Sequence, residues 1–250
     1  MAETEIDAVR ALISSKPRPV GWPERRKRLD EVGGVWPVAD DVELTAVDVN
    51  GVPGEYSTVR GSDPFRVLMF FHGGGYCSGS IRSHRRLVTE AGRAAAMRTL
   101  AVDYRLAPEH PFPAAYDDAL TAWLISPWAD LTMSGSTLVS KAEVDPLIHK
   151  EYLNELAAAY LAAGTDRNDP RVSPLFADFR NFPPMLIQIG SDETLLDDAT
   201  RLAARAGAAD VAVTLEIWPH MIHAWPLWNA HLEDGRRALA SAGSFIRAHL

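Results

Sequence analysis

The stretch from Arg66 to Ser80, RVLMFFHGGGYCSGS, constrains the fold of this 250-residue chain more than any other part of its sequence. Its five consecutive apolar residues, Val67 to Phe71, stand between turn signals, which indicates a strand buried on both faces of a parallel sheet. His72 and three glycines follow directly. Because glycine lets backbone N–H groups turn toward a ligand without a Cβ in the way, the loop predicts an anion cradle. An acyl-transfer enzyme needs such a cradle for its tetrahedral oxyanion.

The remaining pattern alternates strands with helices, which predicts a doubly wound, mostly parallel sheet of the α/β class. We expect strands at 42–50, 55–60, 67–71, 99–103, 185–190 and 211–218, the first two forming an antiparallel hairpin. We expect helices at 4–14, 22–33, 83–95, 114–123, within 138–163, and at 195–206 and 239–246. Ser83 is the predicted N-cap of the third helix. The run ERRKR at 24–28 is typical of a solvated helix face.

Composition narrows the class of protein. A hydrophobic content of 47% excludes global disorder, and a formal charge of −8 with a pI near 5.5 argues against a nucleic-acid or anionic-membrane partner. The length predicts one domain, 1–250. Cys77 is the only cysteine, so neither a disulfide framework nor a thiolate metal cage is expected. Buried packing explains a cysteine at this position better than a role as nucleophile.

The opening residues, MAETEIDAVR, are acidic and have no apolar core of a secretory signal. No stretch approaches the roughly 18 consecutive apolar residues of a membrane-spanning helix. These features predict a cytoplasmic location and no membrane insertion.

A second motif gives the glycine loop its context. Leu100 to Ala115 reads LAVDYRLAPEHPFPAA, and together with HGGGYCSGS it closely resembles the hormone-sensitive-lipase-like family (family IV) of α/β-hydrolase carboxylesterases. The resemblance implies an α/β-hydrolase fold with a helical cap from segments of about 1–40 and 138–175, within the single domain. It also implies short- to medium-chain acyl ester substrates, no metal or organic cofactor, and a possible homodimer through the edge strand at 211–218. The oxyanion donors implied are the N–H groups of Gly73 to Gly75, foremost Gly74 and Gly75.

A hydrolase triad also needs an acid that holds a histidine by its Nδ1–H. In IGSDETLLDD the family pattern aligns Glu193 with the catalytic acid, and Asp192, one place earlier, is the alternative. In WPHMIHAWP the position that matches the catalytic histidine is His223, with His220 as its competitor. The His-x-x-His spacing could serve a metal, but no carboxylate or cysteine stands at metal-ligand spacing, so no metal site is expected.

The sequence departs from the family at the nucleophile. No serine lies in the G-x-S-x-G pattern of the strand-to-helix elbow. The serines that fail this test include Ser78, Ser126, Ser134, Ser136, Ser191 and Ser241. The family places a strand, the elbow and a helix between two pieces that are adjacent here, at Trp123 and Leu124. We therefore expect a sheet without its central nucleophile strand and the following helix, and a weakened or rearranged core.

Three functional hypotheses follow. The first is a carboxylic ester hydrolase of the serine acyl-enzyme type, acting on a small-molecule ester, whose nucleophile serine is not present in this sequence. The second is a catalytically inactive, hydrolase-derived protein that binds a small molecule. The third is a truncated product without a stable fold.

Overall fold

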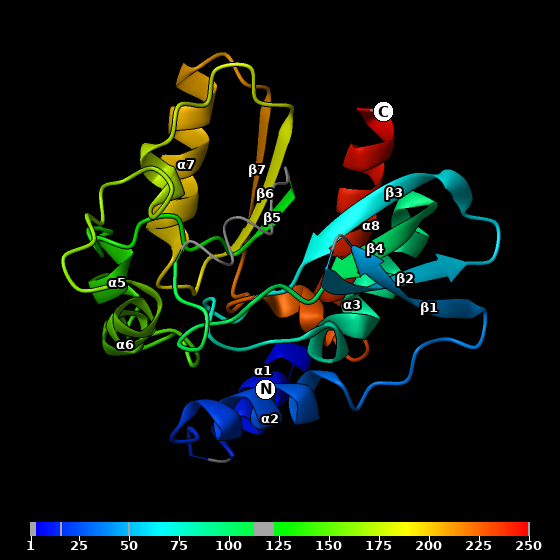
Figure 1. The fold of residues 1–250 in the computed structure, drawn as a ribbon, viewed down its shortest axis with the longest axis horizontal. Helices are drawn as coiled ribbons and strands as arrows, with labels where there is room; N and C mark the ends of the chain where they lie inside the picture. The colour runs from blue at the N-terminus through cyan, green and yellow to red at the C-terminus, as the bar shows by residue number, and fades with distance from the viewer. Residues whose placement is uncertain (1–3, 16, 50, 113–122, 250) are drawn as a thin grey trace. The chain divides into compact units, whose positions relative to one another are not determined.

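The computed structural model describes residues 4–15, 17–49, 51–112 and 123–249, and they form two compact units (Figure 1). Unit 1 comprises Met1–Lys16 and Ala122–Trp225. Unit 2 comprises Pro17–Thr121 and Pro226–Leu250. Each unit has its own β-sheet and is described by itself.

Unit 2 holds a four-stranded sheet in the order β1-β2-β4-β3. Its strands are β1 (Val42–Val49), β2 (Val52–Val59), β3 (Asp63–Phe71) and β4 (Met97–Val102). The pairs β1–β2 and β2–β4 are antiparallel, and β3–β4 is parallel. The predicted hairpin is confirmed, although its second strand begins at Val52 rather than Glu55, so the turn is tighter than the sequence suggested.

The helices of unit 2 are α2 (Trp22–Gly33), α3 (Ile81–Ala95) and α8 (Glu233–Ala248). Helix α3 packs on β2, β4 and α8 (Figure 1). A Cβ at Gly243 of α8 would lie 2.3 Å from the carbonyl oxygen of Ala94, so glycine is what allows the two helices to approach. The prediction that Ser83 caps α3 is wrong by one turn. The N-cap is Ser80, and Ser83 closes the capping box from inside the helix.

Unit 1 holds a parallel sheet in the order β5-β6-β7. Its strands are β5 (Trp123–Ile125), β6 (Met185–Gly190) and β7 (Val213–Trp218), and its helices are α1 (Glu5–Ser14), α5 (Thr137–Ser140), α6 (Lys150–Tyr160) and α7 (Leu196–Ala208). Strand β6 is buried along its whole length, and α7 packs against it and β7 (Figure 1). A 3-10 turn, Pro174–Phe176, precedes β6 in the chain. A second, Trp225–Trp228, contains the chain position at which unit 1 ends and unit 2 resumes.

Most predicted elements lie within a few residues of the observed ones, and strand 185–190 is confirmed to the residue. The helix predicted at 114–123 falls almost entirely on 113–122, outside the described residues, and Trp123 belongs to β5. The single domain with cap segments 1–40 and 138–175 stays a prediction; within those segments, α1 belongs to unit 1 and α2 to unit 2. No helix in the described part of the chain is long and apolar enough to cross a bilayer.

Strand β3 differs from its expected environment. The sequence predicts burial on both faces, but among the described strands β3 is the last of its sheet and pairs only with β4. Phe65 is 94% exposed, and Val67 and Met69, two and four positions on, are also exposed, whereas Leu68 is buried. Alternate side chains point to opposite faces of a strand, so at 67–69 one face of β3 is covered, at Leu68, and the other is open.

The open face of β3 predicts two different responses to substitution. Replacing Val67 and Met69 together by Thr should change the free energy of unfolding little and lower the binding of a hydrophobic dye, because these side chains are already exposed. Leu68→Ala, on the covered face, should cost about 2–3 kcal/mol in chemical denaturation. Equal losses from the two changes would show that both faces of β3 are packed.

Candidate active site

The glycine loop that follows β3 has backbone conformations that favour glycine, and Gly74 requires it. Gly74 has φ 128° and Gly75 has φ 59°. A Cβ at Gly74 would lie 2.1 Å from the carbonyl oxygen of Ser78. The loop is closed by the backbone N–H and the hydroxyl of Ser78, which both donate to the Gly74 carbonyl, at 3.0 and 2.9 Å. The predicted anion cradle is therefore a tight, internally bonded turn.

The three glycine amides are not equivalent. The N–H of Gly73 donates to Nε2 of His84 at 3.3 Å. The N–H groups of Gly74 and Gly75 donate to no other described residue. Gly73, Gly74 and Gly75 were all predicted as oxyanion donors; among the described residues, the last two are the ones whose N–H has no acceptor.

His84, on the first turn of α3, was not singled out from the sequence. It is buried, and its Nδ1 lies 2.9 Å from the hydroxyl of Ser83. Burial, together with the neighbouring His72, lowers the pKa of His84 to about 3. A neutral imidazole can present a lone pair at Nε2, so His84 accepts the Gly73 amide and fixes the start of the loop. Nothing in the sequence distinguishes this histidine from a surface one.

Arg26 corrects the interpretation of ERRKR as a solvated face. Its guanidinium donates to the carbonyl oxygens of Cys77 and Ala107, both at 2.9 Å, and forms a two-pronged ion pair with Glu109. Because Cys77 lies within the glycine loop, the Arg26 side chain ties α2 to the loop. A run of like charges gives no sign of which member turns inward.

In unit 1 the structure brings together Glu193 and His223. Glu193 lies three residues beyond the end of β6 and is fully buried, and His223 follows β7. The Nδ1 atom of His223 is 3.1 Å from Oε2 of Glu193. The other carboxylate oxygen, Oε1, accepts from the N–H of Gly190 at 2.6 Å and from the hydroxyl of Ser126 at 2.8 Å. This is the acid–histidine arrangement of a hydrolase triad.

The alternative residues are engaged elsewhere. Asp192 forms an ion pair with Arg10 of α1 at 2.8 Å. The side chain of His220 is 82% exposed, and its Nδ1 is 4.0 Å from Asp192. Geometry therefore favours Glu193 over Asp192 and His223 over His220 as the interacting pair.

Burial and charge act on this pair in opposite ways. Burial raises the pKa of Glu193, and the hydrogen bonds from His223, Gly190 and Ser126 partly offset that rise. Burial by itself lowers the pKa of His223, but the hydrogen bond and charge of Glu193, with a smaller contribution from Asp145, outweigh it and the net pKa is raised. Within unit 1 no serine hydroxyl donates to Nε2 of His223. Among the described residues of unit 1, the acid and the base are therefore joined without a serine bonded to Nε2.

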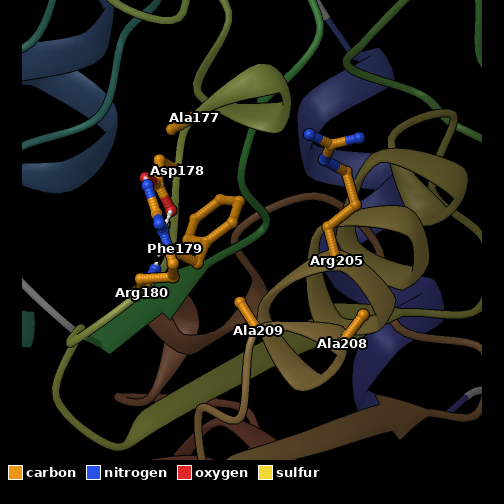
Figure 2. Close-up of a pocket in the computed structure, with 7 residues that line it drawn as sticks. All are labelled: Ala177, Asp178, Phe179, Arg180, Arg205, Ala208 and Ala209. Carbon is orange, nitrogen blue, oxygen red and sulfur yellow. Dashed lines mark hydrogen bonds and ion pairs between the residues drawn. The ribbon is translucent and has the colours of Figure 1, made fainter.

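A pocket elsewhere in unit 1 does not involve this pair. Figure 2 shows its lining, which consists of Ala177, Asp178, Phe179, Arg180, Arg205, Ala208 and Ala209. Arg180 is paired with Asp178 across this surface. Among the described residues no group of three or more His, Cys, Asp or Glu side chains could hold a metal ion.

Comparison with known proteins decides the family. A family model described as the α/β hydrolase fold matches residues 68–124 and 121–227. The chain belongs to this family. An acetyl-hydrolase from Streptomyces hygroscopicus is 34% identical over 303 positions, which cover 99% of this chain and 97% of that protein. An esterase from Acinetobacter venetianus is 30% identical, with 88% and 87% covered.

Solved structures agree. The crystal structure of an esterase from the bacterial hormone-sensitive lipase family has a TM-score of 0.94 to this chain at 34% identity, and the match covers 100% of this chain and 99% of the other. The chain is therefore an α/β-hydrolase of the hormone-sensitive-lipase-like family of carboxylic ester hydrolases, as its two motifs predicted.

The free energy of unfolding should depend on pH through His84, which contacts the glycine loop. A histidine whose pKa is lowered to about 3 binds a proton in the unfolded chain but not in the folded one, so stability should rise with pH between about 3 and 6.5, by up to about 1.4 kcal/mol per pH unit. In His84→Gln this part of the slope should disappear. Unfolding at pH 8, where histidine is neutral in both states, measures the cost of the substitution itself; an unchanged slope in the variant would contradict the buried neutral imidazole.

The Glu193–His223 pair shifts the pKa of His223 in the opposite direction to that of His84. Its imidazole should titrate with a midpoint above the ordinary value of about 6.5, and the midpoint should fall in Glu193→Gln, which removes the charge but keeps the shape. The stability that the raised pKa of His223 contributes is then complete below pH about 6.5 and is lost as pH rises through that raised pKa. An NMR titration of the imidazole carbon-bound protons measures both. A midpoint that is the same in the two proteins would mean that Glu193 does not hold His223.

Proposed function

We propose that this chain is a hydrolase of short- to medium-chain acyl esters in which Glu193 and His223 are the acid–base pair and Gly74 and Gly75, with Gly73, form the oxyanion loop. The observation that carries the proposal is the bond between the buried Glu193 and Nδ1 of His223, which leaves Nε2 to act as a base. The printed name of the Streptomyces relative, an acetyl-hydrolase, supports a short acyl group.

We also propose that this chain lacks the segment that carries the G-x-S-x-G elbow. The two stretches matched by the family model meet at 121–124, close to the Trp123–Leu124 junction inferred from the sequence. The match to the acetyl-hydrolase extends over 303 positions although this chain has 250 residues, so that relative has residues without a counterpart here. The exposed edge strand β3 and the three-residue β5 support the same inference.

Without an elbow serine, we propose that water is the nucleophile. Nε2 of His223 takes a proton from water as the oxygen bonds to the ester carbonyl carbon, which gives a tetrahedral oxyanion. The tetrahedral intermediate then expels the alcohol, which takes the proton back from the imidazolium, and the carboxylic acid is left. Loss of the nucleophile removes most of a triad's rate, so turnover should be slow.

A non-catalytic role is the second candidate. The missing G-x-S-x-G elbow favours a hydrolase-derived protein that binds a small molecule, whereas the retained Glu193–His223 bond favours an enzyme. A homodimer through the strand at 211–218, a cytoplasmic location, and the absence of nucleic-acid partners and of any cofactor stay predictions.

Turnover of a short ester tests the proposal. The purified chain, with its intact mass confirmed against the sequence, should hydrolyse p-nitrophenyl acetate, and His223→Ala should lower the rate at least about tenfold because a positioned base is lost. A fluorophosphonate probe should label no serine.

His220→Ala is the matched control, since His220 lies in the same loop but is exposed and does not contact Glu193. Its rate should equal that of the unmodified chain. Labelling of a single serine would replace water by that serine as nucleophile. A folded protein with no turnover would overturn the esterase proposal in favour of binding.

A further inference from the structure

Ser126 lies directly after β5, and its hydroxyl joins two parts of the acid–histidine pair. The side chain is buried, with the residue 4% exposed. Its Oγ donates to Oε1 of Glu193 at 2.8 Å and accepts from the N–H of Ala224 at 2.9 Å. Ala224 is the residue after His223. The hydroxyl therefore uses its hydrogen on the acid and a lone pair on the loop that carries the histidine.

We propose that Ser126 is a positioning residue, which holds the carboxylate of Glu193 and the His223 loop in the mutual orientation that the base requires. This inference rests on the proposed role of the pair and concerns how the chain maintains it.

The distribution of donors on Glu193 supports the proposal. A carboxylate can turn about its last bond and exchange its two oxygens. Here Oε1 receives two donors, from Gly190 and Ser126, and Oε2 receives Nδ1 of His223. Because three donors arrive from three separate segments, each oxygen has a fixed partner and the carboxylate plane is set. Charge-assisted hydrogen bonds of this kind are among the stronger ones in proteins.

The bond to Ala224 adds a second constraint. Ala224 has φ 53°, an uncommon conformation for a residue with a side chain. Its N–H has Ser126 Oγ as acceptor, so loss of the hydroxyl would leave a partly buried donor without this partner. The backbone on the C-terminal side of His223 is thus tied to the group that also orients its acid.

The same bonds argue against Ser126 as a replacement nucleophile. A nucleophilic serine must give its proton to Nε2 of the histidine. The proton of Ser126 is directed at Glu193, which contacts His223 through Nδ1, the other ring nitrogen. Ser126 therefore acts on the acid side of the imidazole.

The best test variant is Ser126→Gly. Ser126 has φ 49°, which glycine adopts freely, so this change removes the hydroxyl without adding backbone strain. Ser173→Ala is the matched control. Ser173 is also fully buried in unit 1, and its hydroxyl also bridges, donating to the carbonyl of Arg167 at 2.6 Å and accepting from the N–H of Leu131 at 2.8 Å.

The readout is the NMR titration midpoint of the His223 imidazole, with the resonance assigned by its loss in His223→Ala. Ser126→Gly should lower the midpoint by at least about half a pH unit, a roughly threefold loss of proton affinity, because Glu193 is less firmly held against the ring. Ser173→Ala should leave the midpoint in place. Both variants should lower the melting temperature, so stability alone does not separate them.

Two results would overturn the proposal. An unchanged midpoint in Ser126→Gly, with a stability loss like that of Ser173→Ala, would reduce Ser126 to a structural role. A raised midpoint would mean that the hydroxyl only withdraws charge from the carboxylate and does not position it. The titration needs no turnover, so a negative ester assay would defeat the proposed function without deciding the role of Ser126.

Discussion

The buried carboxylate of Glu193 is the group on which the arrangement of unit 1 depends. A carboxylate without solvent is costly unless its oxygens are hydrogen-bonded. The structure meets this demand with donors from the end of β6, from the residue after β5, and from the loop after β7. Three neighbouring parallel strands therefore end at one acid. That convergence places His223 and requires Gly190, where a Cβ would lie 2.1 Å from the carbonyl of Met221.

In unit 2 the backbone of the glycine loop likewise needs hydrogen-bond partners. The loop needs free amides, and the rest of its backbone must be satisfied within the unit. Ser78 bonds the Gly74 carbonyl, Arg26 bonds the Cys77 carbonyl, and His84, kept neutral by burial, accepts the Gly73 amide. What remains is a pair of adjacent glycine donors. Each unit thus holds its predicted site residues in place through contacts of its own.

Local pattern in the sequence predicts the elements well. The apolar run at 185–190 predicts β6 with its observed bounds, and the family pattern in IGSDETLLDD and WPHMIHAWP predicts the pair Glu193 and His223, which the structure places in contact. Ser126, His84 and Arg26 were missed because their roles come from contacts between distant segments; the bond from Ser126 to Glu193 spans 67 positions and that from Arg26 to Cys77 spans 51. The open face of β3 was missed because an apolar run indicates that a strand prefers burial, and it cannot show which elements cover each face.

The most direct test of this account is to observe the Nδ1–H proton of His223 by NMR in the chain as it stands. An imidazole N–H proton that is hydrogen-bonded to a buried carboxylate is protected from exchange with water and resonates far downfield. We expect such a resonance in the unmodified chain and its loss in Glu193→Ala. A folded protein that lacks the resonance would show that Glu193 and His223 are not joined, and would contradict the central claim.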